Sequence, residues 1–306
     1  MEVNSFMKWR KSGLKKIIFM LIVLIVGTVH GENITYKKNK KILTSIQSIY
    51  SIIKSLTKDT DIEVYSIFDS DVSMDYGKSA FDNKDLDLSS AKDAVAVVDV
   101  AKVWGNDYLY EYARRKNIRI VEIDASYSFS GNDYLSLSLL NYKNGDRNPY
   151  VWMSFQNVIK MANIAADDLS ELFPEDSKKI EDNLEKFSQE IKKIENEYLE
   201  KTLALSSLSV ITLTENLDYL FNDLNIFFNY VDSNELTVEK ISEVMKRNNS
   251  KIFVSDRWIK KEIINEIEKK GGKFLVLDNF NIPRELNEKM DPDGYLKGMK
   301  ENMEKL

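Results

Sequence analysis

Short apolar runs alternate with helix-like patterns along the first half of the chain. The runs have the length and the Val and Ile content of buried strands, and apolar residues between them recur at helical spacing. The predicted strands are residues 41–45, 61–67, 94–98 and 118–123. Helices are predicted at 46–56 and 108–116. Strands that alternate with helices pair in parallel through crossover connections, so this half is predicted to form an open α/β sheet.

The pattern changes to one long amphipathic stretch after Pro174. Apolar residues recur there at alternating steps of four and three, at Ile180, Leu184, Phe187, Ile191, Ile194 and Tyr198. This spacing predicts a single helix of about 25 to 30 residues with one apolar face. A coiled coil would need more heptads than this stretch contains. We therefore interpret residues 174–203 as a helix that connects two lobes.

A second α/β series follows this helix. Its predicted strands are residues 209–213, 226–230, 251–254 and 273–277. Its predicted helices are residues 217–221, 237–247, 258–270 and 294–306. The sequence thus predicts an α/β protein with two lobes of mostly parallel sheet flanked by helices and joined by a long rigid helix. The expected division is an N-terminal lobe at 32–173 and a C-terminal lobe at 204–306.

The first 31 residues have the pattern of a secretory signal. Five basic residues precede the apolar run 17–26, and small residues close the segment at Gly31. The run is shorter than the about 20 residues that a membrane helix needs, although an uncleaved anchor stays an alternative. We expect an exported protein that works in the periplasm or another extracytoplasmic space.

Composition narrows the possible functions. The 306 residues include 43 Lys and Arg, 49 Asp and Glu, one His and no Cys, for a net charge of −6. Without Cys the chain has no disulfide, thiolate metal ligand or thiol nucleophile, and its acidic balance argues against nucleic acid as a partner. Removing residues 1–31 takes away five basic residues, one acidic residue and His30, which changes the charge to −10. A mature chain without His lacks the commonest general base, so we do not expect an enzyme.

Four stretches resemble motifs of one protein family. Residues 67–76 resemble a loop of the form Pro-Gly-x-Asp-Pro-His-x-Tyr, and residues 148–154 resemble Asp-Pro-His-x-Trp-x-Ser. Residues 212–221 resemble the loop and helix that carry a third ligand. Residues 275–278 and the tail 294–306 resemble an Asp-bearing strand end and a terminal helix. The chain therefore resembles the metal-type solute-binding proteins of ABC importers, known as cluster A-I.

The resemblance implies a cargo site between the lobes and a membrane permease as partner. The implied ligand positions fall on Met74, Tyr150, Thr214 and Asp278. Only the last keeps a usual ligand type of the family, where the others are His, His, and His or Glu. A thioether, a phenol and a hydroxyl with one carboxylate make a poor zinc site.

Nearby carboxylates offer a different set of ligands. Glu215 follows Thr214, Asp75 follows Met74, and Asp256 follows Ser255. A shift of one residue could bring Glu215 together with Asp278 and with Asp75 or Asp256. Such an oxygen-rich site would hold one divalent metal ion, with manganese or iron favoured over zinc.

Each of these residues also has a purely structural interpretation. Tyr150 could belong to the core beside Pro149, Met74 could be an ordinary contact residue, and Asp278 could form a cap or a salt bridge. The carboxylates could lie on loop surfaces. We therefore keep two hypotheses: a monomeric metal-type solute-binding protein, or the same fold used for a small organic or chelated solute or for a protein partner.

Overall fold

The computed structural model describes residues 40–306 except 69–71, 83–85, 87, 129–132 and 203–207. The predicted signal segment and His30 lie outside the described residues. In the part of the chain that is described, no helix is both long and apolar enough to cross a membrane.

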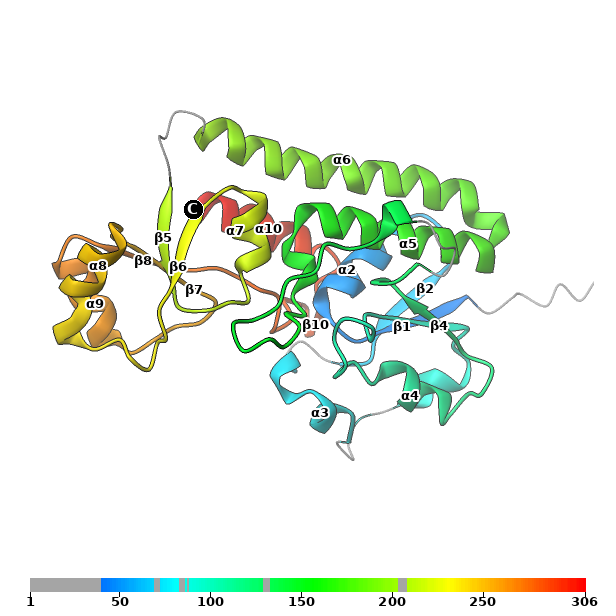
Figure 1. Cartoon of the computed structure of the whole chain (residues 1–306). Coiled ribbons are helices and arrows are strands. Elements are labelled where there is room, and N and C mark those ends of the chain that lie inside the picture. The colour runs from blue at the N-terminus through cyan, green and yellow to red at the C-terminus, as the bar shows by residue number, and fades with distance from the viewer. Residues whose placement is uncertain (1–39, 69–71, 83–85, 87, 129–132, 203–207) are drawn as a thin grey trace, which may run out of the picture. The chain divides into compact units, whose positions relative to one another are not determined.

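Four parallel strands form the first sheet, in the order β2-β1-β3-β4 (Figure 1). They are β1 (Lys41–Thr44), β2 (Glu63–Ser66), β3 (Ala96–Asp99) and β4 (Val121–Asp124). The fourth strand begins three residues later than predicted, because Asn117 Oδ1 accepts the Arg119 N–H at 3.1 Å and holds a turn there. This turn leaves Ile118 78% exposed.

Helices cover both faces of this sheet. On one face α2 (Gln47–Leu56), α5 (Phe155–Leu172), α6 (Ser177–Thr202) and α10 (Gly294–Lys305) pack together. On the other face lie α3 (Lys78–Asp82) and α4 (Leu109–Arg114), with Phe81 and Leu109 in a separate apolar cluster. The carboxyl-terminal helix α10 contacts both α2, the first of the described helices, and α6 (Figure 1).

A second parallel sheet has the order β6-β5-β7-β8. Its strands are β5 (Ser209–Thr212), β6 (Phe227–Tyr230), β7 (Ile252–Ser255) and β8 (Lys273–Val276). Helices α7 (Asp218–Asp223), α8 (Ile241–Asn248) and α9 (Lys261–Lys269) accompany it. Helix α9 starts later than predicted, which leaves Trp258 in the preceding segment and 75% exposed.

The long helix α6 buries the apolar stripe that the sequence showed. Ile180, Phe187, Ile191, Ile194 and Tyr198 are all buried, and α6 runs for 26 residues. Two parallel sheets flanked by helices and one long connecting helix confirm the predicted fold class. A hairpin of β9 (Glu285–Leu286) and β10 (Lys289–Met290) was not predicted. Its turn residues Asn287 and Glu288 have positive φ, which a sequence pattern signals poorly outside Gly.

Candidate functional site

The ends of strands β5, β7 and β8 bring polar side chains to one buried carboxylate, that of Asp256. Carboxyl ends of parallel strands meet at one edge of a sheet, where such folds bind ligands. Asp256 follows β7 directly, and its side chain is only 2% exposed. Oδ2 accepts hydrogen bonds from Thr214 Oγ1 at 3.1 Å, Asn216 Nδ2 at 2.7 Å and Asn279 Nδ2 at 2.8 Å. The Nε of Arg257 lies 3.2 Å from Oδ1.

These contacts determine what Asp256 can do. A carboxylate offers about four lone-pair sites, and four protein donors already approach this one. Its acceptor capacity is therefore used by the protein, and Asp256 orients its neighbours. Thr214 donates its hydroxyl proton to Asp256 and accepts the Asn216 N–H at 3.2 Å, so its oxygen is engaged on both sides.

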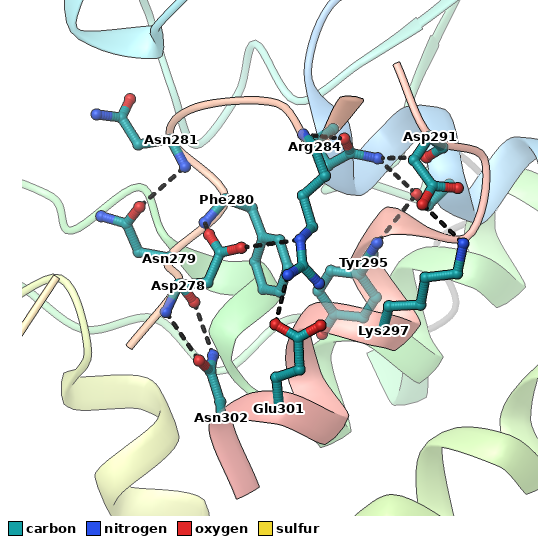
Figure 2. A network of polar contacts seen from close by, with 12 residues as sticks. Asp278, Asn279, Phe280, Asn281, Arg284, Asp291, Tyr295, Lys297, Glu301 and Asn302 are labelled. Atoms are coloured by element: carbon teal, nitrogen blue, oxygen red, sulfur yellow. Dashed lines mark hydrogen bonds and ion pairs between the residues drawn. The ribbon is translucent and has the colours of Figure 1, made fainter. Parts of the chain in front are cut away.

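The carboxylate of Asp278 is held on the α10 side of its loop (Figure 2). Oδ1 accepts the Phe280 N–H at 2.8 Å, and Oδ2 lies 3.5 Å from Nε of Arg284. The amide of Asn302 on α10 binds the Asp278 backbone N–H at 2.8 Å and its carbonyl at 2.7 Å. Burial raises the pKa of Asp278, whereas the Phe280 N–H and Arg284 lower it.

The structure thus supports the salt-bridge interpretation of Asp278 by direct contacts. Neighbouring residues in extended chain point in opposite directions. Accordingly Asn279, the next residue, directs its amide to Asp256 and not to α10. Asn279 thus brings an amide to Asp256, next in the chain to Asp278, the carboxylate that the resemblance implied as a ligand.

Tyr150 lies in the same neighbourhood as Asp256. It is 6% exposed, and its ring is 5.3 Å from that of Trp152. Burial is the main cause that raises its pKa; the charges of Asp75 and Asp256 add to the rise and Arg257 opposes it. Tyr150 is therefore a neutral phenol with both charge signs nearby.

Met74 approaches this region through its backbone. Its N–H donates to the Asn281 carbonyl at 2.9 Å, and its half-buried side chain packs against the main core. Asp75 is exposed, and its N–H donates to Ser73 Oγ at 3.1 Å. Because the Asp75 charge acts on both Tyr150 and Arg257, its carboxylate belongs to the same neighbourhood.

Glu215 is engaged with a loop that precedes α5. Its Oε2 accepts the Lys143 N–H at 2.6 Å, and its carbonyl accepts from Asn148 Nδ2 at 2.8 Å. The Tyr142 hydroxyl donates to Asn216 Oδ1 at 2.8 Å beside it. These bonds connect the loop after β5 with residues 142–148.

The predicted site residues therefore divide into two groups. Tyr150, Thr214, Asp75 and Asp256 share one neighbourhood, and buried Ser255 precedes Asp256 at the end of β7. The carboxylate of Asp278 is bound toward α10, that of Glu215 accepts the Lys143 N–H, and the Met74 side chain packs against the core. Among the described residues, no group of three or more His, Cys, Asp or Glu side chains is arranged to hold a metal ion.

Sequence reasoning missed Arg257 and Asn279. Arg257 is 62% exposed at its side chain and places a permanent positive charge beside Asp256. The contact with Asp256 raises the pKa of Arg257 further. The sequence offered one signal for Arg257, which is that it directly follows Asp256, a candidate carboxylate. The role of Asn279 required knowing which way the chain turns after β8.

Comparison with known proteins bears on this arrangement. The family described as "Zinc-uptake complex component A periplasmic" matches residues 42–306. No curated protein sequence matches the chain.

Solved structures share the fold at low sequence identity. An FpvC mutant from Pseudomonas aeruginosa is 17% identical, with 87% of this chain and 97% of that chain covered and a TM-score of 0.70. FpvC in complex with Mn²⁺ is also 17% identical, with coverages of 88% and 97% and a TM-score of 0.67. A crystal structure of ZnuA is 18% identical, with coverages of 87% and 96% and a TM-score of 0.66.

Proposed function

Because the chain belongs to the ZnuA family of periplasmic zinc-uptake components, we propose that it is the exported solute-binding component of an ABC importer. In this proposal it captures a solute between lobes 32–173 and 204–306, with residues 174–203 as the connecting helix. It then delivers the solute as a monomer to a permease in the membrane. The family membership confirms the predicted resemblance and the prediction that the protein is not an enzyme.

For the cargo, we propose a small organic or chelated solute with anionic oxygens. The observation that carries this choice is an ion pair. The Nε of Arg257 lies 3.2 Å from Oδ1 of Asp256, whose side chain is only 2% exposed. The pair leaves a guanidinium, and not a carboxylate, directed to solvent near Tyr150. The exposed guanidinium can form charge-assisted hydrogen bonds with an anionic oxygen of a ligand.

The neighbouring side chains support the same choice. Tyr150 is a neutral phenol, and the Thr214 oxygen is already engaged by Asp256 and Asn216. Manganese and ferrous iron prefer several carboxylate, carbonyl or water oxygens. A metal that arrives with its own chelating groups would need few ligands from the protein.

A bare manganese or iron ion is the second candidate. It is favoured by Asp75, an exposed carboxylate whose charge reaches Tyr150 and Arg257. Here Asp75 and a rearranged Glu215 would supply the charged oxygens. Binding would then require breaking the 2.6 Å bond between Glu215 and the Lys143 N–H.

Titration calorimetry with elemental analysis separates the two candidates. The mature protein, stripped with a chelator, would be titrated with Mn²⁺, Fe²⁺, Zn²⁺ and Cu²⁺. We expect no saturable heat for any of these ions alone. Stoichiometric Mn²⁺ or Fe²⁺ binding that Asp75→Ala abolishes would establish the bare-ion candidate in its place.

Delivery to a permease needs a separate test. We expect chemical cross-linking in membranes of the source cell to join this chain to a polytopic membrane protein that co-purifies with an ATPase. Recovery of the chain only as an uncross-linked monomer, across several linker lengths, would contradict the importer role.

A further inference from the structure

A cavity of about 650 Å³ opens at the carboxyl ends of β5, β6 and β7. Residues from the loops after all three strands line it, including Thr214, Ser233 and Arg257. Of the four ligand positions implied by the resemblance, only Thr214 contributes to this wall. We call this space the strand-end cavity. It shares Thr214, Asp256 and Arg257 with the region described above, whereas Met74, Tyr150 and Asp278 are not part of its wall.

Its place in the fold is one where open parallel sheets bind ligands. In the order β6-β5-β7-β8, the chain passes from β5 to β6 on one side of β5 and then crosses to β7 on its other side. The loops after β5 and β7 consequently diverge and leave a crevice outside the strand ends. The cavity lies at this crevice, between Thr214 and Arg257.

The cavity offers an anion an exposed guanidinium. Arg257 and Lys260 line it, and Lys143 Nζ lies 4.2 Å from the centre of the Tyr230 ring. Of the acidic wall residues, Asp256 accepts from four donors, and Glu215 accepts the Lys143 N–H. Within the described residues the only hydrogen bond or ion pair of the Arg257 guanidinium is that of Nε, so its two terminal nitrogens remain for a ligand.

The aromatic residues of the cavity favour a flat ligand. Trp258 lines the wall with 75% of its surface exposed, and Phe274 supports it with a ring-centre distance of 6.1 Å. Tyr230 provides a second ring. An exposed indole beside a guanidinium is suited to a ligand that combines a ring with a carboxylate, because the ring stacks while the carboxylate forms a bidentate pair.

We propose that the strand-end cavity binds a planar organic anion of the aromatic carboxylate class, either free or as a metal chelate. Its ring lies against Trp258 and its carboxylate pairs with Arg257. This inference deepens the proposed function, on which it rests, by naming the class of cargo and the wall that recognises it.

Calorimetry with three probes tests the inference on the intact mature protein. The probes are 2,3-dihydroxybenzoate, its ferric complex, and cyclohexanecarboxylate, which has a carboxylate on a ring that is not flat. We expect at least one aromatic probe to bind ten times more tightly than cyclohexanecarboxylate. A preference for the ferric complex would identify a chelate as the cargo, and equal binding of both aromatic probes would identify the free anion.

Matched variants locate the binding. Arg257→Gln and Trp258→Leu should each lower the affinity for the aromatic probe about tenfold or more. Arg247→Gln and Phe227→Leu remove an exposed Arg and an exposed aromatic ring outside the cavity and should leave its affinity unchanged. Melting temperatures show whether the variants fold. If Arg257→Gln disturbs Asp256 and the fold, Trp258→Leu still tests whether the cavity binds the probe.

Failure of this inference is distinguishable from failure of the proposed function. If no aromatic probe binds, if cyclohexanecarboxylate binds equally well, or if Trp258→Leu has no effect, the strand-end cavity is not the recognition site. The importer role would survive that result as long as the chain still cross-links to a permease. If the protein binds an aromatic probe but does not cross-link to a permease, the importer role is overturned, whereas the strand-end cavity remains a binding site.

Discussion

Asn279 donates a hydrogen bond to Asp256 at 2.8 Å, whereas Asp278, the carboxylate that the family resemblance implied as a metal ligand, accepts the Phe280 N–H. The adjacent Asp278 turns to Arg284 and α10. Which of these two neighbouring residues faces Asp256 therefore decides whether the region near Tyr150, which already has the charges of Asp75 and Asp256, receives a third carboxylate. It receives an amide, and Asp256 and Arg257 form the charged pair there.

Removing the Asp256 carboxylate should destabilise the protein strongly. Asp256→Ala would leave the donors of buried Thr214 and Asn279 and of half-buried Asn216 without their acceptor, and an unsatisfied buried group costs about 1–3 kcal/mol. We expect the free energy of unfolding to fall by about 3 kcal/mol in urea denaturation. Exposed Glu268→Ala on α9 is the control and should change little. A loss below about 0.5 kcal/mol for Asp256→Ala would show that the network does not stabilise the fold.

Asp278 should matter for stability and not for cargo. Asp278→Ala removes the acceptor of the Phe280 N–H and the partner of Arg284 (Figure 2). We expect the melting temperature to fall while the affinity for cargo stays within twofold of the parent protein. Calorimetry and thermal unfolding on the same samples give both values. Abolished binding with an unchanged melting temperature would restore Asp278 as a ligand.

The hydroxyl of Tyr295 joins α10 to the segment that holds Tyr150. It donates to the Trp152 carbonyl at 2.6 Å, Trp152 Nε1 donates to the Asn279 carbonyl at 3.0 Å, and Tyr295 is fully buried. Tyr295→Phe should therefore lower the free energy of unfolding by about 1–3 kcal/mol, since a buried carbonyl loses its donor. Tyr76→Phe, at a residue 59% exposed, is the matched control. Equal stability of the two variants would contradict the proposed connection.

Stability should decrease as pH rises from about 4 to 8. Burial raises the pKa of Asp107 to about 7, and burial together with Glu215 raises the pKa of Asp218 to about 7. An unfolded Asp titrates near a pKa of about 3.9, so between these values the folded chain holds protons that the unfolded chain has released. The stabilisation is complete below about pH 4 and is lost as pH rises through about 7.

Asp218→Asn tests this pH dependence. The buried Oδ1 of Asp218 has no hydrogen-bond partner among the described residues, so an uncharged amide tolerates this position better at high pH. Urea unfolding should give equal stability for variant and parent at pH 4 and higher stability for the variant at pH 8. Exposed Glu243→Gln should follow the parent at both values. If the free energy of unfolding changes with pH in Asp218→Asn as it does in the parent protein, Asp218 is already ionised in the folded protein at low pH.

The fold was predictable because its signals are local and repeated. Apolar runs such as 94–98 and the stripe from Ile180 to Tyr198 have the periods of a buried strand and an amphipathic helix. Boundaries were less predictable where a side chain formed a local turn. Asn117 delayed β4 in this way, and the turn at Asn287 and Glu288 formed a hairpin without Gly.

The site was predictable only as a set of positions near the strand ends. Thr214 and Asp256 lie near each other because the sheet brings the ends of β5 and β7 together, and Tyr150 reaches this region from the segment before α5. The sequence could not tell whether Asp278 or Asn279 would face Asp256, since that depends on contacts with Arg284 and Asn302, which lie farther along the chain. The pairing of Asp256 with Arg257 likewise depends on tertiary burial.

Native mass spectrometry of the mature protein, purified from its source without added metal or chelator, most directly tests whether the cargo is an organic anion. We expect a bound mass that contains an organic anion, with or without a metal. A bound mass equal to one bare manganese, iron or zinc ion, with no organic component, would contradict it.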